Sequence, residues 1–142
     1  FARQWGTLGD APGQLNRPMA VALARSGILY VADTANHRIQ RFDTSGTLID
    51  VIGSPGSAPG QIKFPYSIAL ADDDTVFVCE YGNHRISRFD SKAAFVATYG
   101  GPGRGLGQFN GPRGVAISTE GFLYVAATDN HRVQRIPAED VA

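Results

Sequence analysis

The chain has 142 residues, with 13 basic and 13 acidic side chains, so its formal net charge of zero provides no bulk field for nucleic acid or membranes. Seventeen glycines and eight prolines favour short strands and turns over helices, and the longest apolar runs are far too short for a membrane span. The single cysteine, Cys79, excludes an internal disulfide framework and is expected to be an inert core thiol.

The first part of the chain predicts four short strands joined by tight turns, without sustained helical periodicity. The four expected strands are PMAVALA (18–24), ILYVADT (28–34), RIQRFD (38–43) and TLIDVIG (47–53). The first is apolar on both faces and should be central, whereas the last is more polar and should be peripheral. Ile39 and Phe42 cannot share one face of a regular strand, so we expect a twist or bulge near Arg41.

The same pattern recurs twice more at a fixed interval. TANHRIQRF (34–42), YGNHRISRF (81–89) and TDNHRVQRI (128–136) each contain one of the three histidines, and these histidines are 47 residues apart. A fixed period in the range of about 20–50 residues is typical of a solenoid, propeller or array. Because each unit is a four-stranded antiparallel meander, the repeats predict β-propeller blades.

The stretch GQLNRPMAVALARSGILYVADTANHRIQRFDTSG (13–46) resembles the NHL repeat, a family named for its Asn-His-Leu signature. The resemblance extends over residues 1–136 and implies a propeller, which in this family is most often six-bladed. We therefore predict an all-β fold with three four-stranded NHL-type blades, half of a six-bladed ring. The expected parts are an entering outer strand at 1–6, blades at about 14–53, 61–100 and 108–136, and a C-terminal tail at 137–142.

Three blades are too few to close a ring, and an open arc exposes apolar faces and an unpaired strand edge at its two ends. Two arrangements solve this problem. Two identical chains can pair head to tail, each entering strand completing the last blade of the other. Alternatively, further blades of the same or a parent chain, or another subunit, complete the ring.

The recurring Asn-His-Arg group has metal, catalytic and phosphate-binding interpretations, and a structural one. The three histidines lie on separate blades, so they should be too far apart to share a metal ion, whose ligands lie about 2–2.5 Å from it. We therefore predict no metal, no cofactor and no catalytic residue. The signature positions, expected to be structural, are Asn36, His37, Arg38, Asn83, His84, Arg85, Asn130, His131 and Arg132.

The structural interpretation assigns a task to each member of this group. The asparagine is expected to adopt a left-handed conformation in the turn between the second and third strands. The first arginine is expected to pair with the carboxylate that ends the second strand, Asp33 for Arg38 and Glu80 for Arg85. The third repeat has Ala127 in this acidic column, which leaves Asp129 or another group as the partner of Arg132.

Specificity should lie where the repeats differ, next to the proline that begins each innermost strand. Members of the family that bind RNA or protein do so mainly with this channel-mouth face. Aromatic side chains interleaved with arginine and lysine suit protein hot spots and nucleic-acid stacking alike. The candidate rim residues are Arg17, Met19, Lys63, Phe64, Tyr66, Arg104, Asn110 and Arg113.

Three functions are consistent with the sequence. The first is a noncatalytic interaction or assembly module that binds a protein or peptide, or assembles with itself. The second is recognition of single-stranded RNA, although the neutral net charge argues against it. The third is a lyase or lactonase of the related propeller class, which the resemblance allows. The innermost strands offer neither histidine nor acid, and this disfavours an enzyme.

Overall fold

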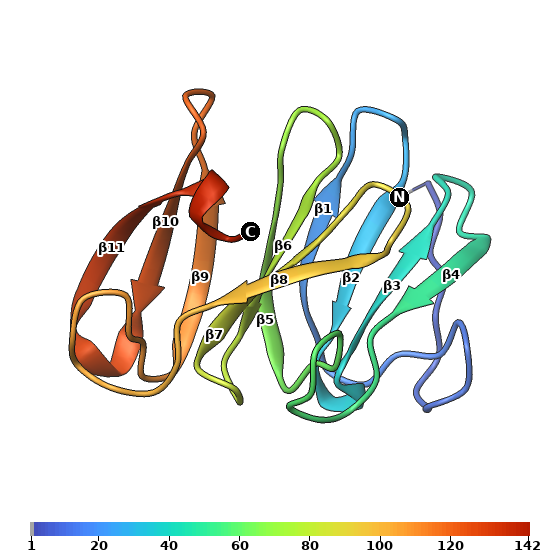
Figure 1. Cartoon of the computed structure of the whole chain (residues 1–142). Coiled ribbons are helices and arrows are strands. Elements are labelled where there is room, and N and C mark those ends of the chain that lie inside the picture. The colour runs from blue at the N-terminus through green and yellow to red at the C-terminus, as the bar shows by residue number, and fades with distance from the viewer. Residues whose placement is uncertain (1) are drawn as a thin grey trace.

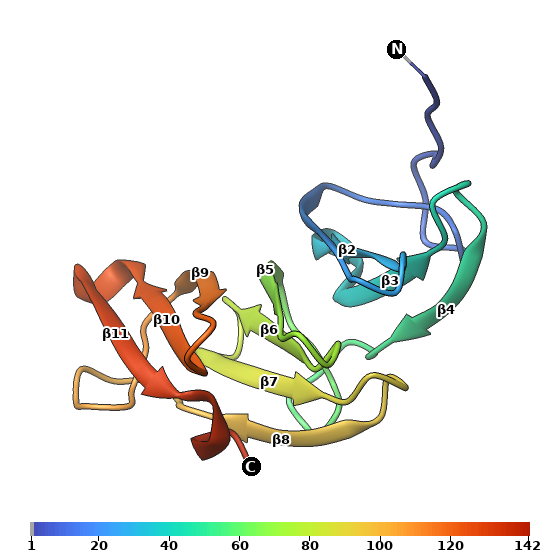
Figure 2. The ribbon, with the colours of Figure 1, turned by 90° about the horizontal axis from the view of Figure 1, so that it is seen from above.

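The computed structural model describes residues 2–142, which form three antiparallel sheets in an open arc (Figures 1 and 2). The first sheet contains β1 (Pro18–Leu23), β2 (Leu29–Asp33), β3 (Arg38–Phe42) and β4 (Leu48–Ile52). The second contains β5 (Pro65–Leu70), β6 (Val76–Glu80), β7 (Arg85–Phe89) and β8 (Phe95–Tyr99). The third contains β9 (Pro112–Ile117), β10 (Phe122–Ala127) and β11 (Arg132–Pro137). The predicted all-β propeller fold is confirmed. The first two blades contain four strands each and the third contains three.

The strands of each blade follow chain order, so every blade is a meander. The innermost strands β1, β5 and β9 are neighbours, and β4 and β8 lie at the outer edge, as predicted for central and peripheral strands (Figure 2). The described residues contain three short 3₁₀ turns: η1 (Thr34–Asn36) between β2 and β3, η2 (Thr128–Asn130) between β10 and β11, and η3 (Ala138–Asp140) after β11. None of the helical turns within residues 2–142 has the length and apolar character needed to cross a membrane.

The irregularity expected near Arg41 is confirmed. The pairing of β3 with β4 shifts register between Arg41 and Phe42, and that of β7 with β8 shifts at the equivalent Arg88 and Phe89. A bulge of this kind increases the local twist of the strand pair. The outer strands therefore curve around the blade, and Ile39 and Phe42 remain on opposite faces.

Apolar side chains of adjacent blades interlock to form two separate cores. Tyr30 and Ile39 of the first blade pack with Val78 and Phe89 of the second. A second cluster lies between the second and third blades, and Cys79 is fully buried in it. Burial raises the pKa of the Cys79 thiol, which keeps it protonated and inert. Each buried aliphatic or aromatic side chain contributes about 1.5–3 kcal/mol, so the blades depend on their neighbours for stability.

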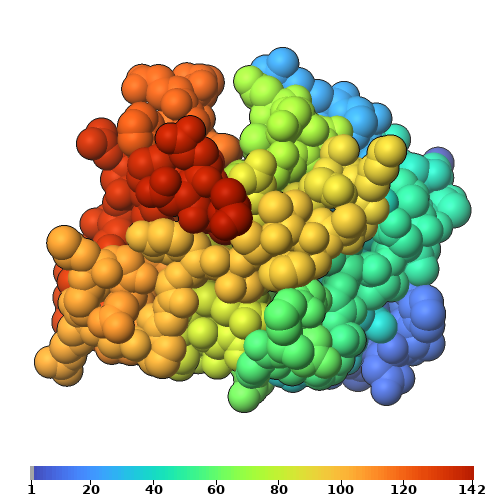
Figure 3. Space-filling view, in the orientation of Figure 1, coloured from blue at the N-terminus to red at the C-terminus, as the bar shows by residue number. Residues whose placement is uncertain are grey.

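The two ends of the chain occupy different places. Residue 1 of the predicted entering strand at 1–6 lies outside the described residues, and residues 2–6 form no strand. Trp5 packs instead beside Phe42, with ring centroids 6.3 Å apart. The predicted tail at 137–142 begins with the last residue of β11 and folds onto the second blade (Figure 3), where Val141 is buried and its carbonyl accepts a hydrogen bond from Arg88.

Candidate functional site

The Asn-His-Arg group of the first repeat holds the loop that leads into its own blade. The Asn36 side-chain amide donates to the Gly9 carbonyl at 2.8 Å. The Arg38 guanidinium donates to the carbonyls of Asp10, Ala11 and Gln14 at 2.9–3.0 Å. Asparagine and arginine therefore satisfy backbone carbonyls of a loop that has no strand partner.

A buried carboxylate organises the same group. Asp33 is fully buried and accepts hydrogen bonds from the backbone N–H of Asn16 and from the side chains of Asn36, Arg38 and Gln40, at 2.7–3.1 Å. The ion pair expected between Arg38 and Asp33 is present, with Nε 2.7 Å from Oδ2. Four donors around one carboxylate compensate the cost of its burial.

The second repeat builds the same arrangement with a longer acid. Arg85 Nε lies 3.0 Å from Glu80 Oε2, which is the other predicted pair. Asn83 and the backbone N–H of Lys63 donate to Oε1, and the Ser87 hydroxyl donates to Oε2. Ser87 occupies the column of Gln40, and Glu80 occupies that of Asp33. The extra methylene of glutamate compensates for the shorter serine side chain.

The third repeat has Ala127 in place of this acid, and among residues 2–142 no carboxylate pairs with Arg132. Arg132 donates to the carbonyls of Gly105 and Gln108, but its buried Nε has no hydrogen-bond partner. Within the described residues no ion pair joins Arg132 to Asp129, so the alternative that Asp129 substitutes for the missing acid is not supported.

The histidines, and not the asparagines, adopt the left-handed conformation. His37, His84 and His131 have φ values of 55°, 54° and 57°. The expectation for asparagine was wrong because Asn36 ends a 3₁₀ turn and uses its side chain to hold the Gly9 carbonyl and Asp33. The left-handed histidine closes that turn and directs its ring towards the next blade.

Each of the first two histidines links its blade to the following one. His37 Nδ1 accepts the backbone N–H of Phe64 at 3.0 Å, and His84 Nδ1 accepts that of Gly111 at 3.0 Å. The His37 ring also meets the Phe64 ring edge to face, with centroids 4.4 Å apart. A ring that accepts at Nδ1 is neutral and carries its proton on Nε2. These imidazoles therefore form the junctions between blades.

Acidification is expected to weaken the first junction. Burial lowers the pKa of His37 and the charge of Lys63 lowers it further, so the unfolded state, at about 6.5, takes up protons first. The free energy of unfolding should therefore fall as the pH drops from about 6.5 through the folded-state pKa. His37→Asn keeps an acceptor and tolerates positive φ but does not titrate. In urea titrations at about pH 7.5 and 5.5, we expect a smaller fall for this variant; equal falls would contradict the assignment.

The structure brings most of the candidate rim residues together. Arg17, Met19, Phe64 and Tyr66 line one small pocket of about 30 Å³ at the start of β1 and β5. Arg113 lies over the Tyr66 ring, with its guanidinium carbon 5.8 Å from the ring centroid. Lys63 is exposed beside Phe64.

Two candidate rim residues lie elsewhere. Arg104 lines a different hollow with the side chains around His131. Asn110 is half-buried, and its side-chain amide bonds Asn130 and the backbone N–H of Gly103, which is a structural role. Both sit at the third blade, away from the aromatic pocket.

Tyr81 belongs to the rim although the columns beside the prolines do not contain it. Its ring stacks on Tyr66 with centroids 4.9 Å apart and 13° between planes, and Arg113 lies 5.2 Å from its centroid. The equivalent residues of the other repeats are Thr34 and Thr128. A search for the repeat position that departs from its column would have found it. We call Tyr66, Tyr81 and Arg113 the rim cluster.

Comparison with known proteins identifies the repeats. A family model for the NHL repeat matches residues 15–42 and 109–136. Over 55 residues the chain is 36% identical to E3 ubiquitin-protein ligase TRIM32 of Homo sapiens, covering 39% of this chain and 8% of that protein. Over 43 residues it is 44% identical to E3 ubiquitin-protein ligase TRIM71 of Gallus gallus, covering 30% of this chain and 5% of that protein. Residues 15–42 and 109–136 are therefore NHL repeats.

The second NHL-type repeat keeps the same register at residues 62–89, with Tyr81 and Ser87 in the columns where the matched repeats have threonine and glutamine.

Among solved structures, Kuenenia stuttgartiensis hydrazine synthase superimposes on 95% of this chain and 35% of its own, with a TM-score of 0.71 and 15% identity. At that identity the likeness shows a shared fold alone.

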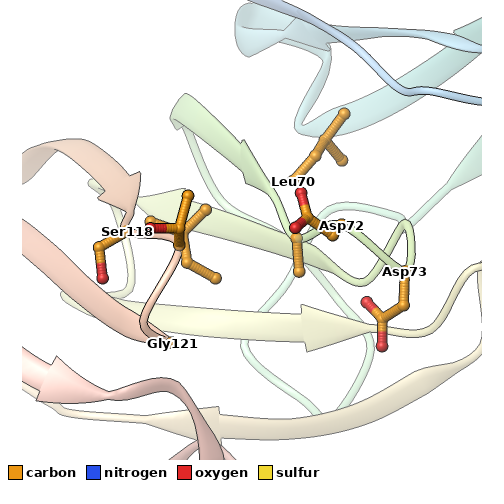
Figure 4. Close-up of a pocket in the computed structure, with 8 residues that line it drawn as sticks. Leu70, Asp72, Asp73, Ser118 and Gly121 are labelled. Atoms are coloured by element: carbon orange, nitrogen blue, oxygen red, sulfur yellow. The ribbon is translucent and has the colours of Figure 1, made fainter.

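The face of the propeller opposite the rim cluster carries a hollow between the turn after β5 and the turn after β9, larger than the rim pocket (Figure 3). Its volume is about 310 Å³, and Asp72, Asp73 and Ser118 line it. Their polar atoms do not converge on one point (Figure 4). Asp72 pairs with Arg25 at 3.3 Å, and Asp73 accepts the backbone N–H of Thr75. The Thr75 hydroxyl and, to a smaller extent, this backbone N–H lower the pKa of Asp73. These carboxylates are engaged locally.

Proposed function

We propose that the chain is a noncatalytic interaction module, which binds a protein or peptide ligand through the channel-mouth face of its propeller. The observation that carries this proposal is the rim cluster. It combines two stacked tyrosines and an exposed guanidinium with a neighbouring apolar pocket. Aromatic and arginine side chains that are rigidly held in this way dominate the energy of protein interfaces.

The histidines and buried acids of the repeat signature hold the architecture together, which supports a noncatalytic function. The Nδ1 atoms of His37 and His84 accept backbone N–H groups of the next blade. Asp33 and Glu80 are fully buried and each accept four hydrogen bonds. Among residues 2–142, no three His, Cys, Asp or Glu side chains lie together in a group that could hold a metal ion.

The chemistry of the rim suggests what the ligand contains. Arg17, Lys63 and Arg113 are exposed around the pocket and the stacked rings, and this favours an acidic group on the ligand. The apolar walls of Met19 and Phe64 favour an aliphatic or aromatic anchor next to that group. An extended peptide with one anchor and one acidic residue satisfies both requirements.

Single-stranded RNA is the second candidate ligand, and one observation favours it. Tyr66 and Tyr81 present nearly parallel rings beside Arg113, an arrangement on which a nucleobase can stack while the guanidinium contacts a phosphate. Binding of this kind weakens steeply with salt, because each phosphate contact releases counterions. Salt dependence therefore separates the two ligands.

A peptide selection tests the proposal. Peptides selected from a random displayed library against the wild-type chain should bind Tyr66→Ala and Arg113→Ala at least about 10-fold more weakly, as expected for hot-spot truncation. Arg104→Ala is the matched control, because Arg104 lies in a different hollow, and it should retain wild-type affinity. Peptides that bind all three variants equally would contradict the rim assignment. Tight, salt-sensitive binding of an RNA pool with no peptide selected would favour the second candidate.

A further inference from the structure

The buried acids of the first two repeats are each surrounded by four hydrogen-bond donors. Each donor set contains a backbone N–H from the loop before the innermost strand, the turn asparagine, the first arginine and the polar side chain two positions after that arginine. The donors are Asn16, Asn36, Arg38 and Gln40 for Asp33, and Lys63, Asn83, Arg85 and Ser87 for Glu80. All of them belong to the same repeat as the acid, so no neighbouring blade is needed to complete a set.

The third repeat has the same donor set around a residue that cannot accept a hydrogen bond. Ala127 stands in the column of Asp33 and Glu80 and is fully buried. The donors equivalent to those around Asp33 are the backbone N–H of Asn110 and the side chains of Asn130, Arg132 and Gln134. The chain therefore keeps four donors where it has lost their common acceptor.

The side-chain donors of the third repeat are held in place by the loop that enters its blade. The Asn130 amide donates to the Gly103 carbonyl at 2.8 Å. The Gln108 carbonyl accepts from the side chains of Gln134 and Arg132, at 2.7 and 3.1 Å. The first repeat makes the three equivalent bonds at 2.6–3.0 Å. The donor set thus keeps its arrangement without the acid.

Two members of this set have no acceptor among residues 2–142. Arg132 Nε is buried and has no hydrogen-bond partner, whereas the equivalent Nε atoms of the first two repeats bind an acid at 2.7 and 3.0 Å. The Asn110 N–H likewise reaches no acceptor, although both of its equivalents bind an acid. Unsatisfied donors and an unpaired charge are both unfavourable in a partly buried site. An anion between these two donors would relieve both penalties.

We propose that the third repeat binds a small carboxylate, of the size of formate, between Arg132 and the Asn110 N–H. One oxygen accepts from the Asn110 N–H and the other from Arg132 Nε, as Oδ1 and Oδ2 of Asp33 accept from the equivalent donors. The ligand is a monoanion because the donor set carries a single guanidinium charge. It is small because alanine differs from aspartate by one carboxylate group, and the ligand takes the place of that group alone.

The site lies where the loop that enters the third blade passes the turn between β10 and β11 (Figure 1). A bound carboxylate ties this loop to the blade, as Asp33 and Glu80 tie the corresponding loops of the first two blades. The stability of the third blade therefore responds to the concentration of small carboxylates. No side chain of the rim cluster belongs to the site, so this proposal can fail or hold independently of the proposed function.

Thermal unfolding of the 142-residue chain in sodium formate tests the proposal. At about pH 7.5 and constant ionic strength, formate replaces methanesulfonate, whose head group is bulkier than a carboxylate. Raising formate from about 1 to 200 mM should raise the wild-type Tm by about 2 °C or more, because only the folded chain binds it. Ala127→Asp is the matched variant, since Gln134 repeats the Gln40 that accompanies Asp33. Its Tm should exceed that of the wild type in methanesulfonate and change by less than about 1 °C with formate.

Equal shifts of the wild type and Ala127→Asp would show a general salt effect, and no shift of the wild type would show that its donors are satisfied by water. Either result would overturn the proposal. A second variant and a local readout keep the test decisive if Ala127→Asp does not fold. Arg132→Gln removes the charge and should abolish the formate response. In amide NMR spectra, the Asn110 N–H signal of the wild type should shift with formate and saturate, and an unchanged signal would contradict the assigned contact.

Discussion

Replacing Glu80 by alanine is expected to lower the free energy of unfolding by about 3–5 kcal/mol, as for the loss of one partner from a buried ion pair. Glu80 is fully buried, and four donors converge on its carboxylate. The alanine variant leaves the Arg85 guanidinium without its counter-charge in a site that is largely closed to water. It also releases the loop that enters the second blade, because Lys63 and Asn83 lose their common acceptor. Urea denaturation followed by tyrosine and tryptophan fluorescence measures the change.

The Arg25–Asp72 pair provides the control for this prediction. Its side chains are more than 70% exposed, with a separation of 3.3 Å between Arg25 Nη2 and Asp72 Oδ1. Exposed pairs contribute about 0–1 kcal/mol, so Asp72→Ala should leave the unfolding curve almost unchanged. Similar, small effects of Glu80→Ala and Asp72→Ala would show that the repeated carboxylate does not stabilise the blade.

The repeat register explains why so much of the fold could be predicted. Residues in one column occupy one environment three times over, so the alternation of RIQRFD, seen again in RISRF, sufficed to place the strands and the irregularity near Arg41. The pairing of Arg38 with Asp33 followed from the same logic. Both side chains lie at facing ends of adjacent antiparallel strands, and this neighbourhood is fixed by local strand pairing alone.

Contacts between blades were less predictable, because no local rule describes them. Asparagine is the usual residue for left-handed turns, yet here the histidine takes that conformation, since its ring must reach the N–H of Phe64 in the next blade. Tyr81 was missed for the same reason. Its neighbours Tyr66 and Arg113 come from the start of its own blade and from the following blade, 15 and 32 positions away in the chain.

The second large effect is expected from Phe89→Ala, which should lower the free energy of unfolding by about 3–5 kcal/mol. Phe89 is almost fully buried in the core between the first two blades, where it packs with Tyr30 and Val78. Its ring also meets Phe95 edge to face, with centroids 5.8 Å apart. Removing the ring leaves a cavity at a junction that the flanking strands cannot close without moving. Leu106→Ala is the control, because Leu106 is 95% exposed and its truncation should change stability by less than about 0.5 kcal/mol.

The location of this effect also tests how the blades depend on one another. The two apolar cores share no buried residue, so the propeller resembles a linear array in which each blade is stabilised by its nearest neighbours. In native-state hydrogen exchange, Phe89→Ala should accelerate exchange in β1–β3 more than in β9–β11, which pack on the intact second core. Equal acceleration in both regions would indicate that the three blades unfold as one unit, with junctions coupled beyond their direct contacts.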